Sequence, residues 1–232
     1  MLTISLIAQK GGTGKTTVAR CLAVAFERAG MAAAILDMDP QASATLWARR
    51  REAPHPEVIP TVLPLLREAL KAAEKSVEVV IIDTPPKNAD VAIEAAKVSD
   101  LIIIPCRAQI DDIETLPATK QILDVTGTRP TFVLLNGVPP NAARCEEAAA
   151  KISGHPTAPL SVCAHTIGHR AAFGDSSILG QTPQEYEPKG RAAEEIEKVH
   201  KFVYDIVRKL RSEKHHVQTE HPRSRRAEAS AR

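Results

Sequence analysis

Aromatic residues are scarce in this chain of 232 residues, where Phe, Trp and Tyr together make up 3%. A platform of stacked aromatic side chains for single-stranded nucleic acid is therefore not expected. The sequence contains no run of about 18 apolar residues, so it predicts no membrane-spanning helix. The first apolar run is short and leads straight into glycines, so we expect no signal peptide.

The chain is also poor in paired cysteines and in net charge. Its four cysteines are widely spaced and form no C-x-x-C pair: Cys21, Cys106, Cys145 and Cys163. This spacing argues against a zinc site, a redox motif or a disulfide framework, and we expect reduced, mostly buried thiols. The formal net charge of +2 is too small to mark the whole chain as a nucleic-acid binder, so any basic surface must be local.

What the sequence does contain is a series of apolar runs that are continuous rather than alternating, as strands covered on both faces require. These runs cover residues 3–8, 31–38, 77–82, 101–105 and 131–135. Helical patterns lie between and after them, at about 16–29, 41–51, 62–75, 88–97, 112–125, 141–152 and 189–210. The alternation predicts a single α/β domain over residues 1–211, with a mostly parallel sheet and helices on both faces. Residues 212–232 are polar and predict a disordered tail.

Polar or special residues follow the five predicted strands. The loops begin at Gln9, Asp39, Asp83, Arg107 and Asn136. Ligands of open α/β sheets bind outside the carboxyl ends of the strands, so we expect these five loops to converge on one crevice.

The first of these loops has the composition of a phosphate-binding loop. Gly14-Lys15-Thr16 lies between a strand and a helix, although Gln9 replaces the leading glycine of the general pattern. Backbone N–H groups and the helix N-terminus are expected to bind nucleotide phosphates along Gly11, Gly12, Thr13, Gly14, Lys15, Thr16 and Thr17. Lys15 is expected to reach the β- and γ-phosphates, and the Thr16 hydroxyl to bind Mg²⁺.

A second lysine, Lys10, precedes the glycines, and a single subunit does not need it to hold phosphates. The whole segment from Lys10 to Thr17 resembles the deviant Walker A motif of the ParA/MinD family of P-loop ATPases. The resemblance implies an enzyme that hydrolyses ATP with Mg²⁺ and a catalytic pair, Lys10 and Lys15. It also implies that Lys10 reaches across an ATP-bound homodimer to the phosphates of the partner, as an arginine finger does.

The segment from Asp37 to Gln41 resembles the second motif of the same family. This implies that Asp39 positions the attacking water as a catalytic residue, while Asp37 is expected to hold the loop. The alternative for Asp39 is a helix cap, because it precedes Pro40 and a helical pattern.

Two further strand ends carry candidate ligands. The apolar run to Ile82 ends in Asp83, and the D-x-P-P form that follows matches the family carboxylate that acts on Mg²⁺. Asn136 stands where the family often contacts adenine, but an asparagine in a turn before Gly137 explains it equally well.

Residues 166–170 and 185–196 resemble the carboxy-terminal part of plasmid- and chromosome-partition ParA proteins, so that the resemblance covers about 1–210. It departs at Gly174-Asp175-Ser176, where a glutamate-alanine pair is expected. The resemblance implies non-specific binding to double-stranded DNA, a ParB/ParG-like centromere-binding partner and a cytoplasmic protein that joins the nucleoid when bound to ATP. No stable membrane association is expected.

Candidate DNA contacts are basic residues near the end of the chain: Arg170, Arg191, Lys198, Lys201, Arg208, Lys209 and Arg211. A solvated helix face explains these charges as well, because acidic residues are interspersed among them. Two alternative functions stay open. A MinD-like membrane-cycling ATPase needs bulky apolar residues in a terminal helix, where the tail offers only Val217. A positioning ATPase for a non-DNA cargo would share every ATP-binding residue.

Overall fold

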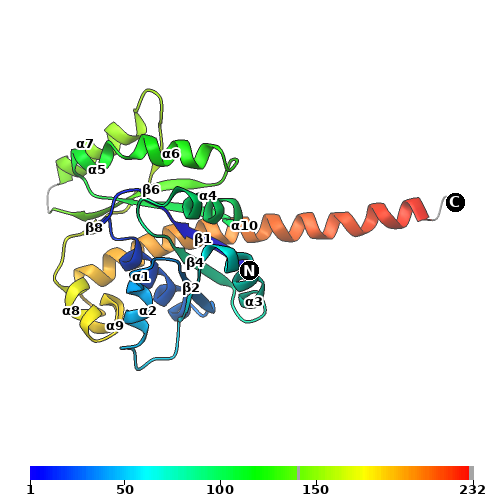
Figure 1. Ribbon diagram of the computed structural model, residues 1–232, viewed down its shortest axis with the longest axis horizontal. Helices are drawn as coiled ribbons and strands as arrows, with labels where there is room; N and C mark the ends of the chain where they lie inside the picture. The colour runs from blue at the N-terminus through cyan, green and yellow to red at the C-terminus, as the bar shows by residue number, and fades with distance from the viewer. Residues whose placement is uncertain (140–141, 230–232) are drawn as a thin grey trace.

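The computed structural model describes residues 1–139 and 142–229, and of residues 213–229 the backbone alone. The sheet contains β1 (Leu2–Leu6), β2 (Ala33–Asp37), β3 (Glu57–Pro60), β4 (Val79–Asp83), β5 (Leu101–Cys106), β6 (Thr131–Val138), β7 (Ser161–Val162) and β8 (Ile167–Gly168). The strand order is β3-β2-β4-β1-β5-β6-β7, with β8 also pairing with β6, and every pairing is parallel. This is the predicted single α/β domain (Figure 1).

The helices connect these strands in the order expected of parallel crossovers. They are α1 (Lys15–Arg28), α2 (Ser43–Ala48), a 3₁₀ turn (Leu63–Leu65), α3 (Leu66–Ala73), α4 (Ala89–Val98), α5 (Ile110–Ile113), α6 (Leu116–Asp124), α7 (Ala142–Ser153), α8 (Ala172–Ile178), α9 (Pro183–Tyr186) and α10 (Arg191–Ala229).

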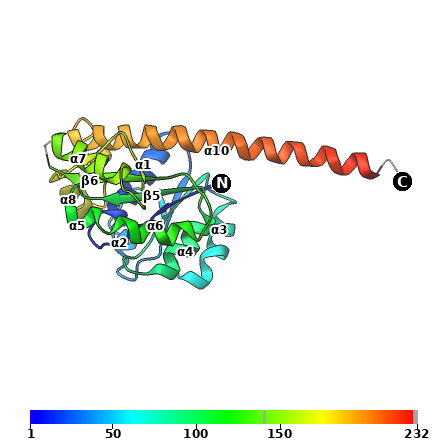
Figure 2. The same ribbon diagram turned by 90° about the horizontal axis from the view of Figure 1, so that it is seen from above.

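Helices cover both faces of the sheet, which explains why the strand runs are apolar throughout. In β4, Val79 and Ile81 pack in the same cluster as α1 and α10, whereas Val80 and Ile82 pack with α3 and α4. In β5 the alternate side chains face α4, α6 and α7. Figure 2 shows α10 on one side of the sheet and α3, α4 and α6 on the other. Because each neighbour in a strand faces a different helical layer, both faces must be apolar.

The five strands expected from the sequence are confirmed, but three others were missed. The edge strand β3 is half-exposed and ends in a proline, so it carries no continuous apolar run. The strands β7 and β8 have two residues each, too few to show a pattern. The helix expected at about 112–125 is confirmed for the most part as α6, but its start is separate, because α5 ends at Ile113 and α6 begins with a proline in its first turn.

The last helix is longer than the sequence indicates. The amphipathic pattern at 189–210 becomes the first half of α10, and the backbone continues as helix to Ala229 through the segment expected to be disordered. In Figure 1 this red part of α10 projects beyond the rest of the molecule. Residues 230–232 of the expected tail lie outside the described residues, and the domain boundary at residue 211 stays a prediction.

Within the part of the chain that the structure describes, no helix combines the length and the apolar character that crossing a membrane requires.

Candidate nucleotide site

The loop between β1 and α1 turns its backbone through two left-handed glycines. Gly12 has φ of 75° and Gly14 has φ of 92°, a region that only glycine adopts readily. Such a turn points successive N–H groups inward at the start of a helix, which is the arrangement that binds phosphate oxygens. The loop therefore has the geometry expected of a phosphate cradle.

Asn136, near the end of β6 and two residues before Val138, contacts this loop. Its Nδ2 donates a 2.7 Å hydrogen bond to the carbonyl oxygen of Thr13, and the residue is buried. A Cβ atom on Gly14 would lie 2.1 Å from the same Nδ2, so any side chain there would displace the Asn136 amide from its hydrogen bond. Asn136 is thus a clamp on the phosphate loop, and an adenine contact by its side chain stays a prediction.

Lys15 points into the molecule. Only 6% of the residue is exposed, and its Nζ donates to the carbonyl oxygen of Ala8 at 3.2 Å. Burial lowers the pKa of the ammonium, although the Asp83 and Asp39 carboxylates oppose this shift. A buried lysine at the first helical position, among strand ends, is placed to meet phosphates bound in its own subunit.

Lys10 lies elsewhere. Its Nζ is 2.5 Å from Oδ1 of Asp112 in α5, and 28% of the Lys10 side chain is exposed. The two lysines of the motif are therefore separated: Lys15 faces inward, and Lys10 forms an ion pair at the rim.

Asp112 binds a second cation as well. Arg107, the residue after β5, donates from Nε to Oδ2 at 2.7 Å and from Nη2 to Oδ1 at 3.1 Å. Burial alone would raise the pKa of the Asp112 carboxyl, but the hydrogen bonds from Arg107 and Lys10 outweigh it and hold that pKa below its ordinary value. Asp112 is consequently a buried anion shared by two cations.

The loop after β2 is held by Asp37. Its Oδ2 accepts from the N–H and the hydroxyl of Thr45 at 2.8 and 2.7 Å, and its Oδ1 accepts from the N–H of Asp39 at 3.2 Å. Asp37 thus holds the loop, as expected. Asp39 accepts from the N–H of Gln41 at 2.9 Å through Oδ1, so it also caps the turn that leads into α2. This bond occupies Oδ1 of Asp39. Orienting an attacking water, the role expected of Asp39, would need only the other carboxylate oxygen.

Asp83 ends β4 beside Asp37, to which it is paired in register on the neighbouring strand. Its side chain is fully buried, and neither carboxylate oxygen has a hydrogen-bond partner among the described residues. Burial raises the pKa of the Asp83 carboxyl to about 7, and the nearby Thr16 hydroxyl and Lys15 ammonium offset only part of this shift. A hard divalent cation prefers such oxygen ligands, so Asp83 and the Thr16 hydroxyl fit Mg²⁺.

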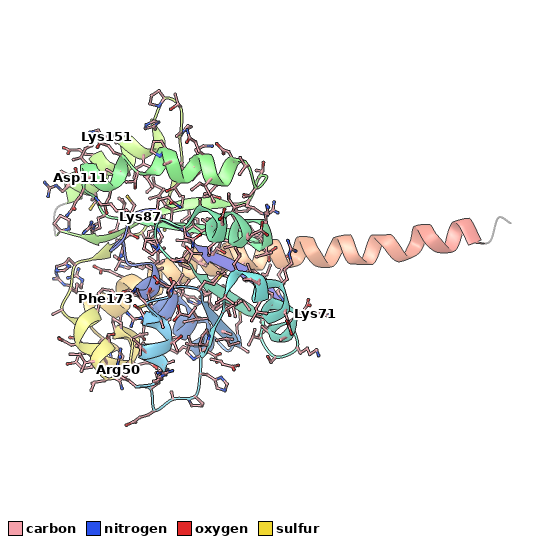
Figure 3. All side chains as sticks on the ribbon, in the orientation of Figure 1. Arg50, Lys71, Lys87, Asp111, Lys151 and Phe173 are labelled. Atoms are coloured by element: carbon pink, nitrogen blue, oxygen red, sulfur yellow. The ribbon has the colours of Figure 1, made fainter. Side chains whose placement is uncertain are left out.

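A cavity of about 1040 Å³ opens next to the phosphate loop. Its lining includes Gly12, Thr17, Arg107, Asn136, Gly137, His169, Arg170 and Phe173. Figure 3 marks Phe173 on α8 and Lys87 in the loop after β4 at this edge of the sheet, where the Lys87 N–H donates to the Gln9 carbonyl at 3.2 Å. The lining thus joins the phosphate loop, the loop after β5 and the end of β6, whereas no residue of the Asp39 and Asp83 loops lines this cavity among the described residues. The volume suits a nucleotide.

The candidate DNA contacts do not share this site. The basic residues of α10 (Arg191, Lys198, Lys201, Arg208, Lys209 and Arg211) are exposed on its outer side, and Arg211 pairs with Glu78 at 2.6 Å. Arg170 is different, because it forms an ion pair with Glu195 and lines the cavity. The structure thus separates Arg170 from the basic face of α10.

The sequence did not reveal two residues of this ion-pair cluster, namely Asp112, the partner of Lys10, and Arg107, the second partner of Asp112. Arg107 begins one of the five loops, and Asp112 lies five residues further on in the next helical turn. The position of Asp112 soon after a strand that ends at the site could have marked it as a candidate. The sequence alone could not show which cations it pairs with.

Comparison with known proteins identifies the class. The model of the CobQ/CobB/MinD/ParA nucleotide-binding domain matches residues 4–183. The chain belongs to this family, and it is an ATPase of the ParA/MinD type.

The relatives include several positioning and partition proteins. Maintenance of carboxysome distribution protein A of Gloeobacter kilaueensis is 29% identical over 208 residues, which cover 84% of this chain and 94% of that protein. The chromosome-partitioning ATPase Soj of Thermus thermophilus is 27% identical over 57% of this chain and 66% of its own. Among solved structures, the ATP complex of McdA from Cyanothece has a TM-score of 0.72 at 18% identity, covering 89% of this chain and 96% of that one. MinD of Pyrococcus horikoshii with Mg-ADP has a TM-score of 0.69 at 20% identity, with coverages of 87% and 95%.

Proposed function

We propose that this ATPase binds ATP with Mg²⁺, dimerises around the nucleotide and, as a dimer, binds DNA non-specifically to drive partition of a plasmid or chromosome with a centromere-binding partner. Hydrolysis of ATP then ends the dimeric state. ATP binding and hydrolysis thus set how long the dimer persists, and they do not drive a reaction on a second substrate.

The observation that carries this proposal is the separation of the two lysines. Lys15 is buried where it meets the phosphates of its own subunit, whereas Lys10 is directed away from them to Asp112 at the rim. A cation at the rim of an ATP site is suited to act on a nucleotide bound by a second copy. Isologous pairing of two copies would place both Lys10 residues in this role at once.

Three further residues take roles in the same reaction. Asp83 and Thr16 would hold Mg²⁺, which would supply positive charge to the phosphates. Asp39 accepts a hydrogen bond from the attacking water through the carboxylate oxygen that does not cap the turn. Lys15 stabilises the charge on the transferring group from within the subunit.

DNA binding is proposed for the outer face of α10. The exposed lysines and arginines there alternate with Glu194, Glu197 and Asp205, so the face is a mixed strip rather than a basic patch. Two copies side by side would double its positive charges, and phosphate contacts of this kind need no base recognition.

A second candidate function is the positioning of a cargo other than DNA. It is favoured by the likeness to the carboxysome distribution protein, which extends over 94% of that relative. Both functions need the same ATP-dependent dimer, and they differ in the partner that stimulates hydrolysis. The partner that raises the ATPase rate of the purified protein decides between them.

Size-exclusion chromatography with light scattering of Asp39→Ala tests the proposal. With ATP and Mg²⁺ this variant is expected to remain a dimer and to retain DNA, because ATP is bound but not hydrolysed. The matched control, Lys15→Ala, should stay monomeric because it cannot bind the phosphates. A monomeric Asp39→Ala protein in saturating ATP, or equal DNA retention without nucleotide, would contradict the proposal.

A further inference from the structure

The ion pair with Asp112 makes movement of Lys10 energetically unfavourable. The Asp112 side chain has no exposed surface, and its carboxylate depends on protein cations for its stability. Lys10 Nζ contacts Oδ1 at 2.5 Å. If Lys10 left to reach a second subunit, a buried carboxylate would lose a cation, and an unpaired buried charge is strongly unfavourable.

Arg107 is a second cation bound to Asp112. Its fork of donors contacts both oxygens of Asp112, Nε to Oδ2 at 2.7 Å and Nη2 to Oδ1 at 3.1 Å. Both oxygens therefore keep a donor after Lys10 has gone. Without Arg107, Oδ2 has no hydrogen-bond donor among the described side chains, and Lys10 would be the remaining cation.

The backbone holds Arg107 in place for this role. It directly follows β5, whose last residue pairs with Leu135 of β6. Its Cγ packs over Gly137, where an added Cβ would lie 4.0 Å away. A guanidinium stays charged at any working pH and matches a carboxylate with two parallel bonds, which a lysine cannot do.

We propose that Arg107 is a positioning residue that keeps Asp112 paired when Lys10 leaves, and so lowers the cost of moving Lys10 to the nucleotide of a second subunit. This inference rests on the proposed ATP-dependent dimer. Arg107 acts through Asp112 and Lys10 rather than on the nucleotide, although its side chain also lines the cavity.

The first test measures dimerisation against ATP concentration. In Arg107→Leu, Lys10 is held by Asp112 alone, so half-maximal dimerisation should need about tenfold more ATP. Arg107→Lys should recover part of this loss through one hydrogen bond. Adding Asp112→Asn to Arg107→Leu should restore dimerisation, because no buried charge then retains Lys10. Wild-type dimerisation by Arg107→Leu, or no rescue by Asp112→Asn, would overturn the proposal.

A direct contact between Arg107 and the nucleotide predicts a different result. In the Lys10→Ala background, which removes the cross-subunit step, Arg107→Leu should lower the affinity of the monomer for a fluorescent ATP analogue by less than about tenfold, even though Arg107 lines the cavity. A loss of affinity of about tenfold or more in this background would make Arg107 a nucleotide ligand and overturn the positioning role.

The last test needs no dimer and so separates the two proposals. Without nucleotide, an amine-reactive probe should modify Lys10 more slowly in Arg107→Leu than in the wild type, and faster in Asp112→Asn, with the modification followed by peptide mass spectrometry. Unchanged or faster modification in Arg107→Leu would contradict the sharing of Asp112. A wild-type protein that stays monomeric in ATP would refute the proposed function, while the modification rates would still decide whether Arg107 competes with Lys10.

Discussion

Three buried carboxylates of the site, Asp37 at the end of β2, Asp83 at the end of β4 and Asp112 in α5, differ in their hydrogen-bond and ion-pair partners. Asp37 accepts backbone and hydroxyl hydrogen bonds, and Asp112 is paired with two cations. Both oxygens of Asp83 are buried without a hydrogen-bond partner among the described residues, although Thr16 and Lys15 lie nearby. A buried carboxylate without donors is unfavourable in the fold, which is why a bound cation would stabilise the protein as well as serve catalysis.

The free energy of unfolding should therefore respond to Asp83→Asn in a pH-dependent way. The folded-state pKa of Asp83, about 7, lies above its ordinary value of 3.8, so ionisation penalises the fold increasingly as pH rises through this window. Without Mg²⁺, Asp83→Asn should stabilise the protein at pH 8 by up to about 4 kcal/mol relative to its effect at pH 4, at about 1.4 kcal/mol per pKa unit.

Denaturant unfolding at the two pH values checks this expectation. Asp205→Asn, on the exposed side of α10, is the matched control and should show no comparable pH dependence. The same Asp83 variant should lose Mg²⁺-dependent ATP hydrolysis. An equal effect on stability at pH 4 and pH 8 would contradict the account of Asp83.

Gly14 provides a second test at this scale. Its φ of 92° and the 2.1 Å approach to Asn136 leave no room for a methyl group. Gly14→Ala should cost at least about 2 kcal/mol of stability and weaken ATP binding more than about tenfold, as measured by denaturation and titration calorimetry. Gly174→Ala is the control for stability, because no described atom lies within 4 Å of its added Cβ and α8 benefits from alanine. Similar results for both variants would refute the steric argument.

The positions of some site residues could be predicted from the sequence, and the contacts of others could not. The positions of Lys15, Thr16 and Asp83 follow from local motifs next to strands, and the structure brings them together at one edge of the sheet. The clamp by Asn136 could not be predicted, because it joins residues 123 positions apart through a side-chain amide. The pairing of Lys10 with Asp112 depends likewise on how two loops meet.

At the scale of elements, α2 is tied to the α8–α9 segment. Trp47 donates from Nε1 to the carbonyl of Gln181 at 3.0 Å, and Arg51 forms two hydrogen bonds with Glu185, at 2.8 and 3.0 Å. The Gly180 turn packs so closely that an added Cβ would lie 2.4 Å from the Arg50 backbone. Because α2 directly follows the Asp39 loop, these contacts stabilise one support of Asp39, the residue proposed to position the attacking water.

Glu185→Gln should weaken this tie. The Arg51 side chain is 3% exposed, so loss of its carboxylate partner leaves a nearly buried charge and should cost about 3 kcal/mol at pH 7. Burial raises the pKa of Glu185, but Arg51 and Thr182 outweigh it and hold that pKa below 4.5. The stabilisation is therefore complete above pH 4.5 and is lost as pH falls through the lowered folded-state pKa.

Chemical denaturation at pH 7 and at pH 3 measures this difference. The exposed Glu197 offers the control Glu197→Gln, whose effect should stay within about 0.5 kcal/mol. If Glu185→Gln were equally harmless at pH 7, the ion pair would not support α2.

Elements with a continuous apolar run could be predicted, and those without one could not. The strands β1, β2, β4, β5 and β6 are covered by helices on both faces, so their residues are apolar throughout. The helix α9 has four residues and depends on a capping box of Thr182 and Glu185. Its place is set by contacts with α1 and α10 that no local pattern reveals.

At the scale of the whole molecule, the outer side of α10 forms one charged surface of the protein. Val199, Val203 and Val207 bury the inner side of the helix against the sheet layer, so the lysines and arginines must point outward. The amphipathic pattern predicted this orientation, whereas the extension to Ala229 has no apolar stripe from which it could be foreseen.

DNA affinity should depend on this face. The double variant Lys198→Glu/Lys201→Glu should weaken DNA binding by the ATP-bound dimer at least about tenfold. It should also flatten the salt dependence by about 0.9 in logarithmic slope for each DNA phosphate that the variant no longer neutralises. Fluorescence anisotropy over a series of salt concentrations measures both quantities. Lys71→Glu is the control, since Lys71 is exposed on α3, on the other side of the sheet (Figures 2 and 3). Equal effects of both variants would indicate a general charge effect rather than a binding face.

The action of Lys10 across a dimer is the central claim, and subunit mixing tests it most directly. Lys10→Ala and Asp39→Ala should each be inactive alone, one lacking the cation and the other the water-positioning carboxylate. In a mixed dimer the Asp39→Ala subunit donates its Lys10 to the intact site of the other. The account predicts that 1:1 mixing restores ATP hydrolysis to roughly a quarter of the wild-type rate, because half of the dimers are mixed and each has one complete site. A mixture as inactive as its components would show that Lys10 acts within its own subunit and would contradict the account.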